Sequence, residues 1–372
     1  MGFTNSMKIP YVDLSYKHKS KKELISIFRK VLNKGQFVGG EEIDLFEKNI
    51  AKLCGTNYAV ALNSGTDALT LALHLLGVRR GDEVITPPNS FIASTAVIVH
   101  LGAKPVFVDV LSDQNIDPKK IQNAITKKTK VIMPVHLSGR MSQMDKIMSI
   151  AKKNNIAVVE DAAQSVGSKY KNKMSGSYGD FGCFSAHPLK NLSALGDSGY
   201  LTTNSFKYYK KTKSLSNHGM ENRNIVKNFG HVSRMDNLQA AFLNYKLKNL
   251  NKVIEQRRKN ALIYIKGLDR RFVFFNNETK DEFNTYHTFV VQVNSRNKLK
   301  KYLLDKGIGT SIHYPVPIHL QPASKFLGYK KGDFRNTETQ SQKILTLPVN
   351  ESLSVDQIKY ICRCINRFYV NK

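Results

Sequence analysis

Lys190 is the residue whose setting most strongly suggests covalent chemistry. It closes the run FGCFSAHPLK, residues 181–190, where a strand-like apolar segment is followed by His187-Pro188, a pair that breaks regular structure. A lysine held at such a corner can lose part of its hydration. A desolvated amine gives up its charge and becomes a nucleophile toward aldehydes. The alternative, which fits most lysines in so basic a chain, is a solvated surface side chain.

A second stretch, IAVVEDAAQS at residues 156–165, ends a buried-type strand on the acidic pair Glu160-Asp161. In open α/β sheets, ligands bind at the carboxyl ends of the strands. An aspartate at that position can keep a pyridine nitrogen protonated, so that a bound pyridoxal ring acts as an electron sink. An acidic pair after a strand also occurs as a simple helix N-cap, so this stretch alone is weak support.

A third stretch, NSGTDAL at residues 63–69, follows the strand-like YAVAL and opens a helical pattern. Backbone N–H groups and two hydroxyls would therefore face an anion at a helix N-terminus. The stretch is not a Walker loop, because no GK[ST] follows, and it lacks the GxGxxG of a dinucleotide site. A phosphate cradle, an aspartate and a lysine in this order are together far more specific than any one of them.

These stretches resemble the DegT-type sugar aminotransferases, pyridoxal 5′-phosphate (PLP) enzymes of the aspartate aminotransferase fold that act on nucleotide-linked keto sugars. The resemblance runs nearly from end to end. Its motifs, in the family's order, are FVGGEEIDLFEKNIA, NSGTDAL, TPPNSFIAST, PVHLSGR, EDAAQSVGS, FSAHPLKNLSALGDSGYL, SRMDNLQAA, HYPVPIHLQP and LTLPVN. So many independent motifs in one order argue strongly against chance similarity.

The resemblance implies that Lys190 and Asp161 are catalytic, the first binding the cofactor covalently and the second facing its ring nitrogen. The further cofactor-binding residues that it implies are Ser64, Gly65 and Thr66 at the phosphate, Phe91 stacked on the ring, Gln164 beside the phenolic oxygen, and Ser185 as a phosphate ligand. Without the resemblance, Phe91 would fit an ordinary core position and Ser185 a satisfied strand serine.

One motif departs from the family pattern. Near residue 230 the family has G-x-N-x-R, whose asparagine reaches the cofactor phosphate of the neighbouring subunit, but here Val232 stands in its place. Either His231 or Ser233 substitutes for it, or the phosphate has one ligand fewer; Ser233 is our candidate. Ala186 and Leu189 also differ from the residues usual around the lysine, which leaves the role of Lys190 unchanged.

Five residues are candidates for substrate binding. They are His187, Arg234, His313, Tyr314 and His319. The last three belong to HYPVPIH, where two prolines would turn the chain and bring their side chains to the mouth of the pocket. The alternatives are a structural role for His187 near its turn, and a rigid connection inside the C-terminal part of the chain for HYPVPIH.

The activity implied is a two-stage amino transfer, with glutamate as the expected donor and pyridoxamine 5′-phosphate (PMP) formed between the stages. Relatives that deoxygenate sugars carry histidine in place of Lys190, so the lysine favours transamination. Residues 233–241 and 312–321 resemble the 3-aminotransferase branch, which suggests C3 of a dTDP-3-keto-6-deoxyhexose, for surface-glycan or antibiotic-type amino sugars. A 4-keto sugar nucleotide is the alternative, and a catalytically silent PLP-binding regulator is the alternative of another class. The family also implies a homodimer with shared active sites.

Composition narrows the classes of function. With 372 residues and 41% hydrophobic content the chain can bury a substantial core. The net charge of +28 can indicate nucleic-acid binding, but the lysines are scattered in ones and twos, so we expect no nucleic-acid partner. Four cysteines without ligand spacing predict a reduced, cytoplasmic chain with no metal site. No stretch approaches the length of a membrane span, so we expect no membrane insertion.

Short apolar runs alternate with amphipathic segments, which predicts an α/β fold with a mostly parallel sheet wrapped by helices. The expected strands are Tyr58–Leu62, Glu83–Thr86, Pro105–Val110, Val131–Val135, Ala157–Glu160, Phe181–Ser185 and Gly199–Thr203. The main expected helices are Lys22–Leu32, Glu41–Leu53, Ala68–Leu76, Met144–Lys152 and Met235–Ile265, the last being one long helix or two. The resemblance adds the fold itself, fold type I of PLP-dependent transferases, with a mixed seven-stranded sheet between helices.

We place a domain boundary near Gly267. Residues 1–266 would form a basic lead-in and the large PLP-binding domain, and residues 267–372 a small α+β domain. The elements expected in the small domain are strands at Phe272–Phe275 and Thr288–Val293 and helices at Lys298–Leu304 and Asp356–Phe368.

Overall fold

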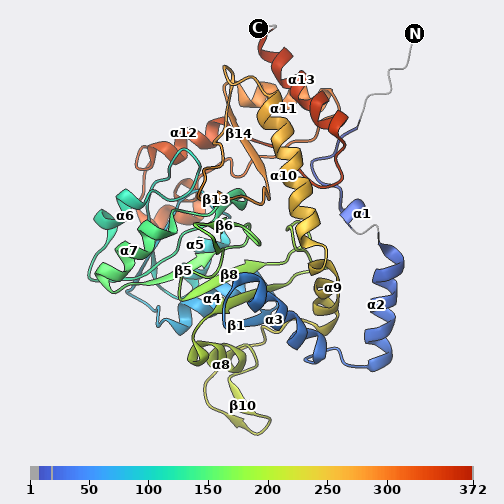
Figure 1. Ribbon diagram of the computed structural model, residues 1–372. Helices are drawn as coiled ribbons and strands as arrows, with labels where there is room; N and C mark the ends of the chain where they lie inside the picture. The colour runs from blue at the N-terminus through green and yellow to red at the C-terminus, as the bar shows by residue number, and fades with distance from the viewer. Residues whose placement is uncertain (1–7, 18–19, 371–372) are drawn as a thin grey trace.

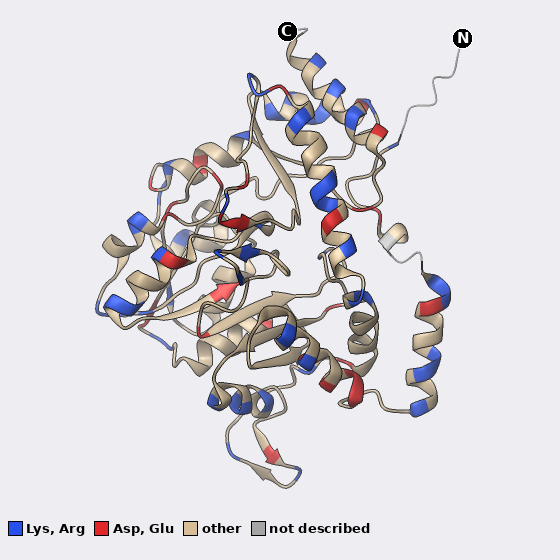
Figure 2. Ribbon diagram, viewed as in Figure 1, with Lys and Arg blue, Asp and Glu red and all other residues tan. Residues whose placement is uncertain are grey.

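The computed structural model describes residues 8–17 and 20–370. The basic lead-in expected over the first 20 residues or so therefore lies partly outside the described residues. Within them, no helix is long and apolar enough to cross a bilayer. Lysine and arginine are spread over many helices and loops in Figure 2 and form no single stripe there, as their scatter along the sequence predicts.

A seven-stranded sheet lies at the centre of the molecule (Figure 1). Its strands, in spatial order, are β1 (Tyr58–Leu62), β9 (Gly199–Thr203), β8 (Phe181–Ser185), β5 (Ala157–Asp161), β4 (Thr129–Ile132), β2 (Glu83–Thr86) and β3 (Lys104–Phe107). Only β9 runs against its neighbours; β8, β5, β4, β2 and β3 pair in parallel. The prediction of a mostly parallel, mixed seven-stranded sheet is confirmed.

Helices cover both faces of this sheet, which is why its strands are apolar on both sides. Val159 of β5 packs into the cluster that includes α4 (Gly65–Leu75) and α5 (Ala93–His100). Its neighbour Val158 points the other way, into the cluster of α6 (Pro118–Ala124) and α7 (Met144–Asn154). Alternate residues of one strand therefore fill two separate cores, and each strand end is held from both sides.

The region expected as one long helix or two is two helices, α9 (Asn237–Leu247) and α10 (Leu250–Gly267). α9 packs with α3 (Glu41–Cys54) against the β1–β9–β8 side of the sheet. The remaining N-terminal helices are α1 (Leu14–Lys17) and α2 (Lys21–Lys34), and α8 (Phe206–Leu215) follows β9. A hairpin of β10 (Met220–Asn222) and β11 (Ile225–Val226) projects beyond α8 at the bottom of Figure 1. The sequence did not indicate this hairpin.

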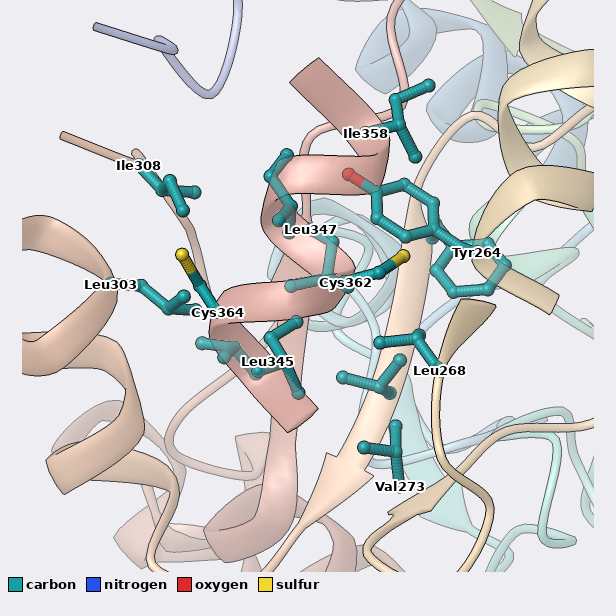
Figure 3. Close-up of a cluster of buried hydrophobic side chains, with 14 of the residues drawn as sticks. Tyr264, Leu268, Val273, Leu303, Ile308, Leu345, Leu347, Ile358, Cys362 and Cys364 are labelled. Atoms are coloured by element: carbon teal, nitrogen blue, oxygen red, sulfur yellow. The ribbon is translucent and has the colours of Figure 1, made fainter. Parts of the chain in front are cut away.

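The C-terminal part forms a second core around an antiparallel sheet of β12 (Val273–Phe274), β14 (Phe289–Val293) and β15 (Ile344–Leu347). α11 (Arg296–Asp305) and α13 (Val355–Val370) cover it. Figure 3 shows Cys362 and Cys364 on opposite sides of α13, the first toward Tyr264 and the second toward Leu303. Because Tyr264 belongs to α10, this core includes residues before position 267. The division of the chain into residues 1–266 and 267–372 stays a prediction.

Short elements join the two cores. β13 (Glu282–Phe283) pairs with β6 (Lys169–Tyr170), which pairs with β7 (Lys173–Met174). The 3-10 helix η2 (Ile318–Leu320), η3 (Pro322–Leu327) and α12 (Arg335–Lys343) lie near the end of β3, where Phe107 packs with Ile318 and Phe334. Asp109 accepts backbone hydrogen bonds from Asn336 and Thr337, both at 3.0 Å, and so caps α12 from the other core.

Candidate active site

The carboxyl ends of the parallel strands meet at one edge of the sheet, and a cavity of about 410 Å³ opens there. The sequence-predicted residues that line it are Ser64, Gly65, Thr66, Phe91, Asp161, Gln164, Ser185, His187, Lys190, His313 and Tyr314. They come from the ends of β1, β2, β5 and β8 and from the chain before β15. Four strand ends and one distant loop thus bring together residues up to 250 positions apart, from Ser64 to Tyr314.

The N-terminus of α4 forms a cradle for an anion on one side of the cavity. The Ser64 Oγ caps the helix by accepting a hydrogen bond from the Asp67 N–H at 3.0 Å. The N–H groups of Gly65 and Thr66, in the first turn of α4, have no acceptor within the helix and form the positive end of its dipole. A Cβ at Gly199 would lie 2.2 Å from the Ser64 carbonyl carbon, so only glycine lets β9 approach this turn. With the Ser185 hydroxyl beside Gly65, the cradle fits a phosphate group.

Asp161 lies buried at the end of β5 and lines the same cavity. Its carboxylate accepts hydrogen bonds from the Ser94 Oγ at 2.7 Å and from the Ala163 N–H at 3.2 Å. Burial raises the pKa of Asp161, while these two bonds and the charge of Lys190 oppose the shift. When the buried Asp161 is ionised, a cationic neighbour stabilises its carboxylate, and a protonated ring nitrogen would be such a neighbour.

Lys190 sits on a short loop that returns to its starting point, because the Ala194 N–H donates to the Ala186 carbonyl at 2.7 Å. Within the loop, the Lys190 N–H donates to the His187 carbonyl at 2.8 Å. Burial lowers the pKa of the Lys190 amine to about 8, and the charge of Asp161 opposes the shift. A substantial fraction of the amine is therefore neutral near pH 8 and can attack a carbonyl carbon, as the sequence suggested.

Phe91 and Tyr314 are aromatic residues that line the cavity together with the cradle and Asp161. Phe91 is 57% exposed although it lies on a mostly buried loop, and its ring centroid is 6.1 Å from that of Tyr314. Burial raises the pKa of Tyr314 to about 12, so its phenol remains a donor. The Gln164 Nε2 donates to that phenol at 3.4 Å, while its Oε1 accepts from the Ser138 N–H at 2.8 Å. An exposed aromatic face between a phosphate cradle and a carboxylate fits a flat ring such as that of PLP.

His313 is held beside Tyr314 with its Nδ1 3.0 Å from the Thr346 Oγ1. Burial and the positive charge of Lys190 lower the pKa of His313 to about 4, so its imidazole is neutral at physiological pH. A neutral imidazole can form hydrogen bonds with a bound molecule without adding charge to the cavity.

Three of the candidates lie elsewhere in this chain. The placement of His319 at the mouth of the pocket is wrong: its ring is buried, 3.0 Å from the Glu338 Oε1 and packed edge-on against Phe334. The buried Ser233 donates to the Asn63 Oδ1 at 3.2 Å, and Arg234 donates to the Asn217 Oδ1 at 2.9 Å. Neither Ser233 nor Arg234 lines the cavity of its own chain.

The structure also adds residues that the sequence analysis missed. Ser94 donates a hydrogen bond to Asp161. It could have been found from the sequence, because it lies three residues after Phe91, where a helix begins beyond β2. His287 and Asp197 also line the cavity, but no motif surrounds His287. Behind the site, the fully buried Glu160 accepts backbone hydrogen bonds from Gly176, Tyr178 and Gly179 and lies 3.0 Å from the His136 Nε2.

Comparison with known proteins agrees with this arrangement. The DegT/DnrJ/EryC1/StrS aminotransferase family matches residues 18–366. The chain belongs to this family. It is a PLP-dependent aminotransferase with the fold of the sugar aminotransferases, as the sequence predicted, and PLP is its cofactor.

Two curated relatives match this aminotransferase over nearly their whole lengths. The "Pleiotropic regulatory protein" of Geobacillus stearothermophilus is 36% identical, with 98% of this chain and 99% of that protein covered. The dTDP-3-amino-3,6-dideoxy-alpha-D-galactopyranose transaminase of Aneurinibacillus thermoaerophilus is 38% identical, with 97% and 99% covered.

Solved structures give the same result. The crystal structure of S. venezuelae DesV in complex with a ketimine intermediate superposes with a TM-score of 0.95 at 33% identity, covering 97% of this chain and 98% of that one. The putative sugar aminotransferase Spr1654 from Streptococcus pneumoniae, in its PLP form, gives a TM-score of 0.89 at 28% identity, with 94% and 96% covered.

The lowered pKa of Lys190 leads to a testable pH dependence. Because the neutral amine is the nucleophile, coupling of Lys190 to a small aldehyde in the cofactor-free aminotransferase should increase with pH and level off above about 8. In urea-unfolded protein the increase should instead centre near the ordinary lysine pKa, about 10.4. Borohydride trapping followed by mass spectrometry of the Lys190 peptide measures both curves. Asp161→Asn removes the charge that raises this pKa, so its midpoint should move to lower pH, and a move to higher pH would contradict the account.

Proposed function

We propose that this aminotransferase moves the amino group of L-glutamate to C3 of a nucleotide-linked 3-keto sugar, a dTDP-3-keto-6-deoxyhexose. The observation that carries the proposal is the convergence of Lys190, Asp161 and the α4 N-terminus on one cavity. The choice of C3 is supported by the form of residues 233–241 and 312–321 and by the relative named as a dTDP-3-amino sugar transaminase. The free cysteines, buried and unpaired among the described residues, suit the reducing cytoplasm, where we place the protein.

When bound, PLP supplies an electron sink that stabilises negative charge on the amino-bearing carbon. The Lys190 amine would bind the cofactor and, when free of it, could carry the proton to and from that carbon. Asp161 would hold the ring nitrogen protonated, and Ser94 keeps the Asp161 carboxylate in place. Gly65, Thr66 and Ser185 would hold the phosphate. Phe91, exposed in the cavity, would pack against the ring and so restrict the direction from which the Lys190 amine reaches the reacting carbon.

The sugar nucleotide would enter past His187, His313 and Tyr314. All three line the cavity; His187 is exposed, whereas His313 and Tyr314 are partly buried. Neutral imidazole and phenol groups can hydrogen-bond sugar hydroxyls or the diphosphate, and these bonds decide which sugar carbon reaches the amine. A sugar in the wrong orientation leaves buried donors unpaired, which is how such a pocket discriminates isomers.

A homodimer with shared sites accounts for the segment around residue 230. Phe229 is fully exposed, and the exposed fractions of Ile225, Val226 and Val232 are near one half. Apolar side chains on a projecting hairpin are typical of a protein interface. If this segment packs on a second copy, Arg234 lies next to it and can help complete the partner's phosphate site, in place of the asparagine whose position Val232 occupies. The buried Ser233 is already bonded to Asn63 of its own chain.

The role of Lys190 can be tested by substitution. Lys190→Ala should fold normally, trap no cofactor with borohydride, and lose at least about 100-fold in the rate of amino transfer, because it has neither the covalent anchor nor the proton carrier. Lys248→Ala, which removes an exposed lysine, serves as the control and should match the wild type. Cofactor trapped on a different lysine would show that the assignment is wrong.

Shared sites can be tested by mixing two inactive variants. Lys190→Ala and Arg234→Ala chains should each be nearly inactive alone. After subunit exchange, one site of each mixed dimer carries neither substitution, so about a quarter of the wild-type activity should return. Sedimentation checks that both variants are dimers. A fully active monomer, or exchange without any recovery, would rule out shared sites.

The position of amination can be tested with matched substrates. We expect glutamate and a dTDP-3-keto-6-deoxyhexose to be converted at least 10-fold faster than the 4-keto isomer, because a few buried hydrogen bonds discriminate isomers strongly. The position of the new amine is determined by NMR of the product. Faster conversion of the 4-keto isomer would refute the C3 proposal while leaving the aminotransferase assignment intact.

A further inference from the structure

The loop that carries Lys190 is held at its far end by a second lysine. Lys246, on α9, donates from its Nζ to the Ser193 carbonyl at 2.7 Å and lies 3.3 Å from the Ser193 Oγ. Ser193 is three residues beyond Lys190 and directly precedes Ala194, whose N–H closes the loop. Lys246 therefore holds the loop next to the point where its two ends meet. A charged donor to a backbone carbonyl makes a stronger hydrogen bond than a neutral one.

The ammonium group of Lys246 is partly buried and interacts with a charge from the C-terminal core. Burial lowers the pKa of Lys246 to about 8, and the charge of Glu351 opposes that shift. Glu351 also forms a 3.0 Å ion pair with the buried Arg257 of α10. The charge of Glu351 therefore compensates two cations, the partly buried Lys246 and the buried Arg257.

Side chains of α10 fix the main chain next to Glu351 and next to the cavity. The Asn260 side chain donates to the Asn350 carbonyl at 2.8 Å, which fixes the residue before Glu351. Arg257, one turn earlier on α10, donates to the carbonyls of Tyr286 and His287 at 3.3 and 3.2 Å. His287 lines the active-site cavity. The connection therefore runs from the loop of Lys190 through the hydrogen bonds of Lys246, its charge interaction with Glu351 and the Glu351–Arg257 ion pair to His287 in the cavity lining.

We propose that Lys246 is a positioning residue for Lys190, and that Glu351 and Arg257 stabilise its charge so that the loop of Lys190 and the segment of His287 keep one relative geometry. The inference rests on the proposed role of Lys190. Lys246 does not line the cavity, so it acts only through the loop that it binds. A displacement of about 1 Å at a reacting amine is enough to lower a rate about 100-fold, so loss of this contact should be visible in the chemistry of Lys190.

The test uses Lys246→Met, which keeps the length of the side chain but removes its charge and its donor. In the cofactor-free protein we expect Lys190 to couple with added PLP about 10- to 100-fold more slowly, measured by borohydride trapping and peptide mapping. In the PLP-loaded enzyme, kcat should fall while the KM for the sugar nucleotide changes less than about twofold, because His313 and Tyr314 are untouched. Lys246→Arg, which keeps the charge and the donors, should restore most of the rate.

Lys248→Met provides the matched control, because Lys248 is exposed two residues further along the chain. Coupling at the wild-type rate in Lys246→Met, with or without a lower melting temperature, would overturn the inference, as would an equal slowing in Lys248→Met. If Lys246→Met fails to fold, Glu351→Gln keeps the shape of the network and should slow coupling at least about threefold; wild-type coupling there would also overturn it. Cofactor trapped on a lysine other than Lys190 would instead refute the proposed function.

Discussion

A lysine amine and an aspartate carboxylate line one cavity at the edge of the sheet, and the rest of the site depends on keeping them there. Burial disfavours the charged form of both groups, lowering the pKa of Lys190 and raising that of Asp161, while their mutual attraction opposes both shifts. Removing an ion from water costs several kcal/mol even after relaxation. Apolar packing on the two faces of the sheet must offset that cost. Asp161 stands at the end of β5, a strand that is packed from both faces.

The second constraint is that the walls of the cavity belong to distant parts of the chain. The Asn191 side chain donates to the Thr285 carbonyl at 3.2 Å, and the Thr285 N–H donates to the Gly139 carbonyl at 3.0 Å. A Cβ at Gly139 would lie 2.8 Å from the backbone nitrogens of Tyr286 and His287, so the two segments touch through their main chains. Backbone contacts of this kind leave little freedom for relative motion, and an orientation-dependent reaction needs that rigidity.

The sequence predicted the elements whose pattern is local and strong. β1, β2, β8 and β9 have the predicted boundaries, because each is a short run that is buried and ends at a turn or a helix start. β6, β7 and β13 were missed because two-residue strands have no periodicity to detect. Of the predicted site residues, those at or just after the ends of β1, β5 and β8 line the cavity. His319 was misplaced because the chain enters a 3-10 helix after Pro317, which turns the side chain inward to Glu338. Lys246 could not be found from sequence, since its contact with Ser193 spans 53 residues.

In the proposed reaction, PLP in this cavity takes up the amino group of an amino acid, and the resulting PMP passes that group to a keto sugar. The absorption spectrum of the purified protein, recorded before and after addition of glutamate, tests it most directly. The account predicts a visible band from bound PLP that disappears with glutamate as PMP forms and returns when a nucleotide-linked keto sugar is added. A protein that binds PLP but keeps its band unchanged with glutamate and with the other common amino acids would contradict the account.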